Sequence, residues 1–265
     1  MSTLKIIQAL IFMNNIQGGN TMSFLEKDAK NMYIDDAYGD FFIEDIQHGE
    51  NFNKVLNLIK NKNASSILDC GYGSGNIAEK LAELPSSTTI DLIEGSAILC
   101  SKAESRLGTR ICIINSFFED YVPIKKYDII LALHILEHIE NPISLLERFY
   151  SWLNPNGIVI AAVPNANSIH RQLAVMLNLQ PSLDHLSQRD IAVSHKRVYT
   201  SSELKSQFEM VGFNITELSG YFLKIVPNSM MLNWSPELIS GLTKISENIP
   251  SELLANIFLV AEKRI

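Results

Sequence analysis

The sequence predicts a doubly wound α/β fold, in which a closing antiparallel pair of strands completes a mostly parallel sheet. From residue 65 onward, short apolar runs alternate with segments of helical periodicity, the usual pattern of a parallel sheet with crossover helices. Three glycines stand between the first apolar run and the first of these helices. The last two runs, residues 213–223 and 255–264, alternate apolar and polar residues as antiparallel strands do.

The expected elements follow one another in a regular order. Strands are expected at residues 65–70, 88–94, 110–116, 127–133 and 158–163, helices at 76–84, 97–107 and 141–153, and a turn at 154–157. Asn141 is a suitable N-cap, and Pro142 suits the first position of its helix. Thr200 and Glu203 have capping-box spacing, so a helix is expected at residues 202–211, ended by Gly212, and another at residues 235–246.

Residues 164–200 interrupt this alternation and contain no clear strand. We therefore expect an N-terminal extension and helical segment at residues 1–50, followed by one domain at residues 51–265 with an insertion at about 164–200. The first 15 residues hold a short apolar run that lacks a signal-peptide cleavage site and is too short to span a membrane.

The composition narrows the possible partners. The chain of 265 residues has 46% apolar and 19% charged residues, which is typical of a globular protein. Its formal net charge of −7 argues against a nucleic-acid partner, which needs a basic face, and no membrane partner is expected. Cys70, Cys100 and Cys112 have no metal-ligand spacing and stand in runs expected to be buried. A reducing, cytoplasmic location is therefore expected.

A glycine loop with the pattern D-x-G-x-G-x-G runs from Asp69 to Gly75, between the first strand and the first helix. Glycines at this place allow a tight turn and the close approach of a ligand to the backbone. The dinucleotide-binding fingerprint requires glycine or alanine at position 76, where this chain has Asn76, which disfavours a nicotinamide cofactor. Glu94 ends the second strand, where a carboxylate can accept hydrogen bonds from both hydroxyls of a ribose.

The glycine loop resembles motif I of the class I S-adenosylmethionine-dependent methyltransferases. With Glu94, the end of the third strand and HILEHIENP after the fourth, roughly residues 50–220 resemble the ubiquinone-pathway O-methyltransferases and bacterial sugar and natural-product methyltransferases. The resemblance implies a Rossmann-like sheet and S-adenosylmethionine as cofactor. Phe117 is a candidate adenine contact, although either it or Phe118 is expected to pack in the core. The implied cofactor-binding residues are Asp69, Gly71, Gly73, Gly75, Glu94, Ser116, Phe117 and Leu133.

HILEH, residues 134–138, also matches the H-x-x-E-H pattern of a class of zinc peptidases. Such a site needs both histidines on one face of a long helix. Here a strand runs into His134, and Pro142 disfavours helical geometry at residue 141, which leaves room for about two helical turns. The sequence therefore excludes the peptidase. Relatives with E-x-x-E-H at this place bind a divalent cation with a downstream histidine, so a cation stays possible here, although His134 replaces their first glutamate.

The expected catalytic residues are His134, His138 and His195, as the base that removes a proton from a hydroxyl or as cation ligands. For His138, a structural role in the loop after the fourth strand is an equal alternative. The insertion resembles the segment that closes over the acceptor in bacterial methyltransferases. Its candidates for acceptor binding are Pro164, Asn165, Asn167, His170, Arg171, Arg197 and Tyr199, although for the two arginines exposed salt bridges are an equal alternative.

These expectations combine into one functional hypothesis. The chain is expected to be a cytoplasmic methyltransferase that methylates an oxygen of a small polar or sugar-type acceptor in capsule, lipopolysaccharide or natural-product biosynthesis. N-methylation and RNA methylation are alternatives, and the acidic composition counts against RNA. A third alternative is a methyltransferase-like protein that binds the cofactor or a partner without catalysis.

Overall fold

The computed structural model describes residues 42–231 and 233–264, so the expectations for residues 1–41 lie outside the described part of the chain. The first described element is helix α3 (Phe42–Lys62). The expected boundary between residues 50 and 51 falls inside this helix. Its residues Phe52, Val55 and Ile59 are buried in the core, so this helix is integral to the fold.

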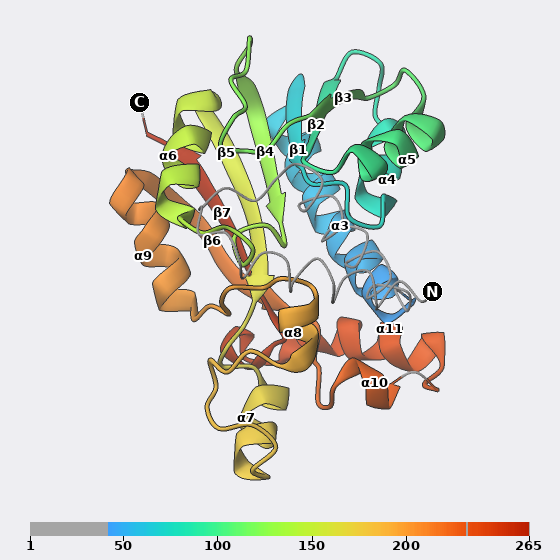
Figure 1. Cartoon of the computed structure of the whole chain (residues 1–265), viewed down its shortest axis with the longest axis vertical. Helices are drawn as coiled ribbons and strands as arrows, with labels where there is room; N and C mark the ends of the chain where they lie inside the picture. The colour runs from blue at the N-terminus through green and yellow to red at the C-terminus, as the bar shows by residue number, and fades with distance from the viewer. Residues whose placement is uncertain (1–41, 232, 265) are drawn as a thin grey trace, which may run out of the picture.

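A single seven-stranded sheet forms the centre of the described chain, and the doubly wound α/β prediction is confirmed (Figure 1). The strand order is β3-β2-β1-β4-β5-β7-β6, and every neighbouring pair is parallel except the two that involve β7. The strands are β1 (Ser66–Cys70), β2 (Thr89–Glu94), β3 (Cys112–Asn115), β4 (Tyr127–Leu133), β5 (Leu153–Pro164), β6 (Phe213–Tyr221) and β7 (Asn256–Lys263).

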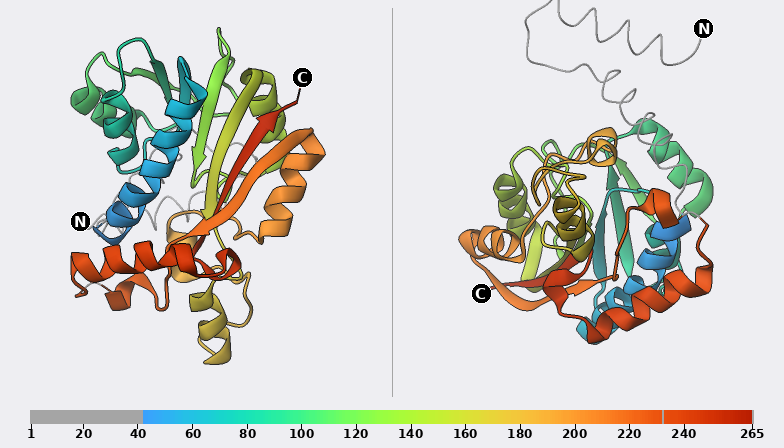
Figure 2. Two further views of the ribbon diagram at one scale, coloured as in Figure 1. Left: turned by 180° about the vertical axis from the view of Figure 1, so that it is seen from behind. Right: turned by 90° about the horizontal axis from the view of Figure 1, so that it is seen from below.

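Helices cover both faces of the sheet (Figure 2). Buried residues of α3, α4 (Asn76–Ala82), α5 (Ala97–Leu107) and α11 (Pro236–Ile245) form one apolar cluster with one sheet face. Those of α6 (Pro142–Trp152) and α9 (Ser201–Val211) form a second cluster with the other face. The short helices α10 (Asn228–Met231), η1 (Ser246–Asn248) and η2 (Ser251–Leu253) lie between β6 and β7 in the chain. Among the described helices, none has the length and apolar character to cross a membrane.

Local signals place the ends of two helices as expected. The Asn141 side chain accepts a hydrogen bond from the Ser144 backbone, and α6 begins at Pro142. Helix α9 begins with the expected capping box, in which Thr200 and Glu203 each accept a bond from the other's backbone N–H. It ends at Val211, and the next residue, Gly212, caps it with a φ of 101°, the left-handed conformation that glycine adopts easily.

Two local expectations were wrong. Residues 154–157 belong to β5 instead of forming a separate turn, because Leu153 still pairs with Tyr127 and the intervening residues bulge out before Ile158 pairs with Ile129. Cys70 and Cys100 are buried as expected, but Cys112 is exposed. Its strand, β3, lies at the edge of the sheet, which explains the exposure.

The insertion contains no named strand but carries two helices that the sequence did not predict, α7 (Ile169–Met176) and α8 (Gln188–Ala192). Both lie beyond the carboxyl ends of the parallel strands, at the lower end of the sheet in Figure 1. The two ends of the insertion meet in a parallel bridge between Asn165 and Tyr199. The inserted segment therefore leaves and rejoins the sheet at nearly the same place, at the carboxyl ends of the strands, where ligands bind in such folds.

Candidate functional site

The glycine loop connects β1 to α4 with three residues at positive φ: Gly71 at 83°, Gly73 at 53° and Gly75 at 90°. A Cβ atom at Gly75 would lie 2.5 Å from the Tyr72 hydroxyl oxygen, so glycine is required there by space as well as by conformation. A Cβ at Gly71 would lie 2.8 Å from Cδ1 of Ile135, which places HILEH directly beside this loop. A Cβ at Gly73 would meet no atom within 4 Å, so this loop position faces open space.

Glu94 lies at the end of β2, next to the glycine loop. Its carboxylate accepts backbone hydrogen bonds from Tyr72 at 2.9 Å and from Ser96 at 2.8 Å, one on each oxygen. Burial raises the pKa of Glu94 above its ordinary value, although these backbone N–H groups act in the opposite direction. Because a carboxylate oxygen accepts more than one hydrogen bond, Glu94 can hold the loop and still bind ribose hydroxyls.

Asp69 is 4% exposed, and its Oδ2 atom is buried without a hydrogen-bond partner. Burial raises the pKa of Asp69 to about 8, because no neighbouring group compensates the lost hydration of the carboxylate. Burial and the nearby Asp69 also raise the pKa of the Cys70 thiol. A buried acid without a partner at the edge of a ligand loop fits a cationic group of the ligand.

The end of β3 distinguishes the two phenylalanines. The Phe117 ring lies over Gly95, where an added Cβ would be 2.5 Å from Phe117 Cε1, whereas Phe118 packs against the apolar core. Ser116 donates its backbone N–H to Glu94 O at 3.0 Å and its hydroxyl to Phe117 O, so its main-chain donor is already used. Phe117 is therefore better placed than Ser116 to contact an adenine. Leu133, half-buried at the end of β4, packs against the first cluster.

HILEH forms a turn after β4, so the long helix of a zinc peptidase is absent here, and the structure has no helical turn in the space that the sequence left for about two. His134 has the left-handed φ of 58°, an unusual conformation for histidine that often marks functional sites. Its Nδ1 lies 3.0 Å from Glu137 Oε1, and its Nε2 lies 2.8 Å from the Tyr221 hydroxyl. Both ring nitrogens of His134 are therefore engaged, and the imidazole links β6 to the Glu137 carboxylate.

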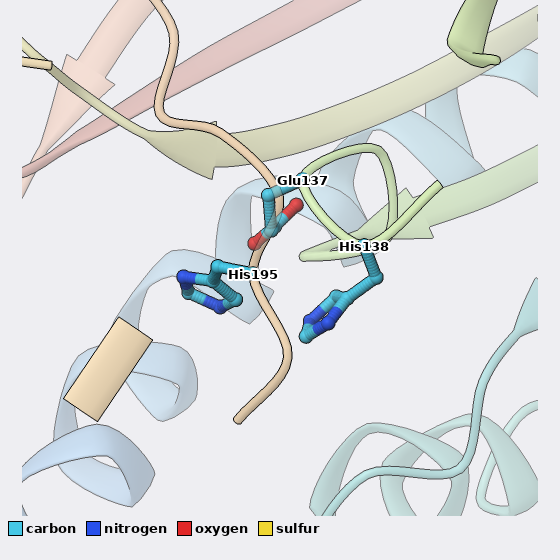
Figure 3. A group of neighbouring side chains, drawn as sticks. All are labelled: Glu137, His138 and His195. Carbon is cyan, nitrogen blue, oxygen red and sulfur yellow. The ribbon is translucent and has the colours of Figure 1, made fainter. Parts of the chain in front are cut away.

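The side chains of Glu137, His138 and His195 form a compact cluster, which we call the Glu-His-His cluster (Figure 3). One potential ligand atom from each residue lies within 4.8 Å of the others. Glu137 and His138 come from the turn after β4, and His195 follows α8 in the insertion (Figure 3). The rings of the two histidines meet edge to face, with centroids 4.7 Å apart. Two of the three expected catalytic histidines are thus brought together.

Burial and charge set the protonation of this cluster. Burial alone would raise the pKa of the fully buried Glu137, but the hydrogen bond from His134 and the surrounding imidazoles lower it below its ordinary value. Burial lowers the pKa of His138 to about 4, with a further contribution from the neighbouring histidines, against the effect of Glu137. Glu137 Oε2 has no hydrogen-bond partner. The cluster therefore combines a buried anionic oxygen with a neutral imidazole.

The C-terminal end of the insertion is fastened to the HILEH turn. Lys196 donates its backbone N–H to Glu137 O at 2.8 Å, and its ammonium pairs with Glu140. Arg197 donates to Glu140 O at 3.1 Å, and the buried Tyr199 hydroxyl donates to Leu136 O at 3.3 Å. Arg197 and Tyr199, expected to bind the acceptor, therefore hold the insertion against this turn.

Asn165 is 1% exposed, with its amide donating to Glu252 O and Leu254 O, so this expected acceptor contact instead anchors the insertion. For the half-buried Asn167, the structure records no side-chain hydrogen bond among the described residues. His170 has a buried Nδ1 without a partner, and burial lowers its pKa to about 2, with smaller contributions from Lys224 and Arg171. Asn167 and His170 thus keep polar groups available for a ligand.

Sequence reasoning missed two residues of this arrangement. Glu137 was not among the expected site residues, although it stands between the two histidines of HILEH. Asp190, whose carboxylate lies 3.1 Å from Nδ1 of His195, carried no signal, since an acid in a polar insertion is usually exposed.

Comparisons with known proteins show what this chain is similar to. A family model described as a methyltransferase domain matches residues 43–218. The ubiquinone biosynthesis O-methyltransferase of Azorhizobium caulinodans is 27% identical over 161 residues, which cover 58% of this chain and 60% of the relative's length. That of Glaesserella parasuis is 24% identical over 222 residues, which cover 79% of this chain and 93% of the relative.

Among solved structures, the plantazolicin methyltransferase BpumL in complex with SAH matches with a TM-score of 0.60. The match covers 92% of this chain and 93% of that one, at 18% sequence identity. At this identity the likeness shows a common fold, the Rossmann-like sheet that the glycine loop had implied.

Proposed function

Because this chain belongs to the class I S-adenosylmethionine-dependent methyltransferases, we propose that it methylates a hydroxyl oxygen of a small polar or sugar-type acceptor. We place this acceptor in capsule, lipopolysaccharide or natural-product biosynthesis. The observation that carries the proposal is the Glu-His-His cluster, two of whose residues belong to the turn after β4, where Ile135 lies beside the glycine loop. A hydroxyl must lose its proton during methyl transfer, and this cluster offers proton acceptors at that place.

The residues around the glycine loop fit the cofactor. Glu94 can accept hydrogen bonds from ribose hydroxyls, and the unpartnered Oδ2 of Asp69 suits a cationic amino group. The open space at Gly73 lets a ligand approach the backbone, and the Phe117 ring supplies an apolar surface. S-adenosylmethionine, when bound, supplies an electrophilic methyl group.

Of the three expected catalytic histidines, His195 is the proposed base. The pKa of His138, about 4, makes it a poor proton acceptor near neutral pH, and both ring nitrogens of His134 are engaged. The acceptor oxygen bonds to the methyl carbon as the sulfur–carbon bond breaks, and the hydroxyl proton passes to His195. The protein's main contribution is alignment, which the insertion supports by covering the site. Asn167 and His170 are its proposed acceptor contacts.

The cluster also fits a divalent cation. Two imidazoles and a carboxylate are donors that Zn²⁺, Mn²⁺ and related ions accept, and Glu137 Oε2 is a buried anionic oxygen without a partner. Glu137, His138 and His195 would hold the ion, which would polarise the acceptor hydroxyl and favour its deprotonation. His134 stands where the cation-binding relatives have a glutamate. It would not bind the ion itself but would orient Glu137 through their hydrogen bond.

A panel of hydroxylated and amine acceptors, assayed with labelled S-adenosylmethionine, tests the proposal. We expect O-methylated products and a kcat about 100-fold lower for His195→Gln, since a positioned base contributes at least about this factor. The matched control is His185→Gln, an exposed histidine of the same insertion, which should act like wild type.

Chelation separates the two ways in which the cluster can act. Loss of activity with EDTA and recovery with Mn²⁺ or Zn²⁺ would assign the cation, whereas undiminished activity would assign His195 alone. Methylation of nitrogen instead of oxygen, or full activity of His195→Gln, would contradict the proposal.

A further inference from the structure

Within the insertion, His195 makes two contacts with one residue, Asp190. Its Nδ1 lies 3.1 Å from Asp190 Oδ1, and its backbone N–H donates to the Asp190 carbonyl at 2.7 Å. The same residue therefore fixes both the main chain and the ring of His195. The side chains of both residues are 12% exposed, so little water competes for the contact.

The Asp190 carboxylate is itself held from the other side. Its Oδ2 accepts hydrogen bonds from Arg171 Nη2 at 2.8 Å and from the Ser187 backbone and hydroxyl at 2.9 and 2.8 Å. Arg171 is 6% exposed and also donates to the carbonyls of Leu183 and His185. Because a guanidinium stays protonated in proteins, the buried pair keeps Asp190 an anion.

An anionic carboxylate accepts hydrogen bonds and donates none, so the contact with Asp190 requires a hydrogen on Nδ1 of His195. In a neutral imidazole the lone pair then resides on Nε2. This tautomer is the one that a proton acceptor or cation ligand at Nε2 needs. The opposite tautomer would place two lone pairs against each other at the Asp190 contact.

We propose that Asp190 is the positioning residue of His195: anchored by Arg171 and Ser187, it fixes the Nδ1–H tautomer and keeps the Nε2 lone pair for the Glu-His-His cluster. This inference rests on the proposed function only for its effect on turnover. Arg171 belongs to α7 and Asp190 to α8. Besides its proposed contacts with the acceptor, the insertion would therefore also orient His195, one of the three residues of the cluster.

Nitrogen NMR of histidine-labelled, chelator-treated protein tests the tautomer directly, with His195→Gln to assign the signal. We expect His195 to be the Nδ1–H tautomer in wild type. In Asp190→Asn it should shift toward Nε2–H, because the amide can turn its NH₂ group to the ring. The kcat should fall by about 100-fold or more, as in a serine-protease triad that loses its aspartate, whereas KM for S-adenosylmethionine should stay within about twofold.

Asp184→Asn is the matched control, an exposed aspartate of the same insertion, and should change neither readout. Asp190→Glu keeps the negative charge and should restore the Nδ1–H signal. An Nε2–H or mixed tautomer in wild type would overturn the proposal even if Asp190→Asn failed to fold. An unchanged tautomer in folded Asp190→Asn would also overturn it. These spectra need no acceptor, so they stand apart from the search for the methylated substrate.

Discussion

Asp69 and Glu94 lie at the carboxyl ends of adjacent strands of the sheet, but their carboxyl groups differ in hydrogen bonding. Glu94 has two backbone donors, whereas Oδ2 of Asp69 has none and its pKa is raised to about 8. A group with a raised folded-state pKa binds more protons in the folded than in the unfolded chain between the two pKa values. The contribution of Asp69 to the free energy of unfolding is therefore fully present at low pH, and it is lost as the pH rises from about 4 toward 8.

The change Asp69→Asn replaces this acid by a neutral side chain of the same shape. We compare the free energy of unfolding of Asp69→Asn with that of wild type at pH 5 and at pH 8. From pH 5 to pH 8, the difference should change in favour of the variant by on the order of 1–3 kcal/mol, because only wild type loses stability as Asp69 ionises. Urea unfolding at both pH values measures it. The exposed Asp120→Asn serves as control and should show no such trend, and a pH-independent effect of Asp69→Asn would contradict the assignment.

At the level of single residues, the sequence predicts the place of some residues in the fold, while their roles in binding stay predictions. Gly75 needs its positive φ, and Glu94 ends a strand beside the loop, so both could be selected from the pattern. The contacts of His134 are not predictable in the same way, because no local signal indicates that Tyr221 engages its second nitrogen. The burial of Tyr199 is not predictable either, because polar aromatic residues in a loop region occur both exposed and buried.

Helix α9 shows how one element connects the site to the core. It follows directly after the insertion, and its residues Leu204 and Phe208 are fully buried against the sheet. Its start is fixed by the capping box of Thr200 and Glu203. The cap therefore sets where the insertion ends, and its hydrogen bonds join Thr200 to Glu203, neither of which belongs to the Glu-His-His cluster.

Thr200→Ala removes the side-chain acceptor for the Glu203 backbone N–H. We expect the free energy of unfolding to fall by about 1 kcal/mol, because an N-cap of this kind contributes about that much. Steady-state kinetics of the folded variant should remain as in wild type. Ser206→Ala, at an exposed position of the same helix, should change stability by less than about 0.5 kcal/mol. A Thr200→Ala variant as stable as wild type would show that this box contributes nothing.

The elements that sequence reasoning did not predict are α7 and α8. Helix α8 has five residues, too few for a helical repeat of apolar positions to appear. Its capping box joins Ser187 to Asp190, and this acid in the first turn is also the partner of His195. The insertion is also held by contacts over longer separations, between Arg171 and Asp190 and between Asn165 and Tyr199, which local sequence patterns do not predict.

For the whole molecule, the order of strands and helices was predictable, because each strand of a parallel sheet needs a crossover helix. The closing antiparallel pair was also foreseen from its alternation. The proposed cofactor-binding residues lie at the carboxyl ends of β1, β2, β3 and β4, whereas the proposed acceptor contacts belong to the insertion. Ligand binding by the cofactor side should therefore stabilise the chain even when no acceptor is known.

S-adenosylhomocysteine at about 100 times its Kd should add roughly 2.7 kcal/mol to the free energy of unfolding. For a chain of this size we expect Tm to rise by about 5–10 °C in a thermal melt. NADH should produce no shift, because Asn76 breaks the dinucleotide fingerprint. Glu94→Gln should reduce the shift, and the exposed Glu104→Gln should preserve it. A shift with NADH equal to that with S-adenosylhomocysteine would refute the selectivity.

The meeting of the two ends of the insertion at Asn165 and Tyr199 has an evolutionary consequence. A segment whose ends are already joined can change length at little entropic cost to the rest of the chain. Acceptor preference can therefore diverge by exchange of this segment while the cofactor half stays constant. Since the segment also carries Asp190 and the proposed base His195, a grafted replacement would bring its own base together with its proposed acceptor contacts. An exchange between homologues should therefore move the whole inserted segment, with its equivalents of Asp190 and His195, and not a part of it.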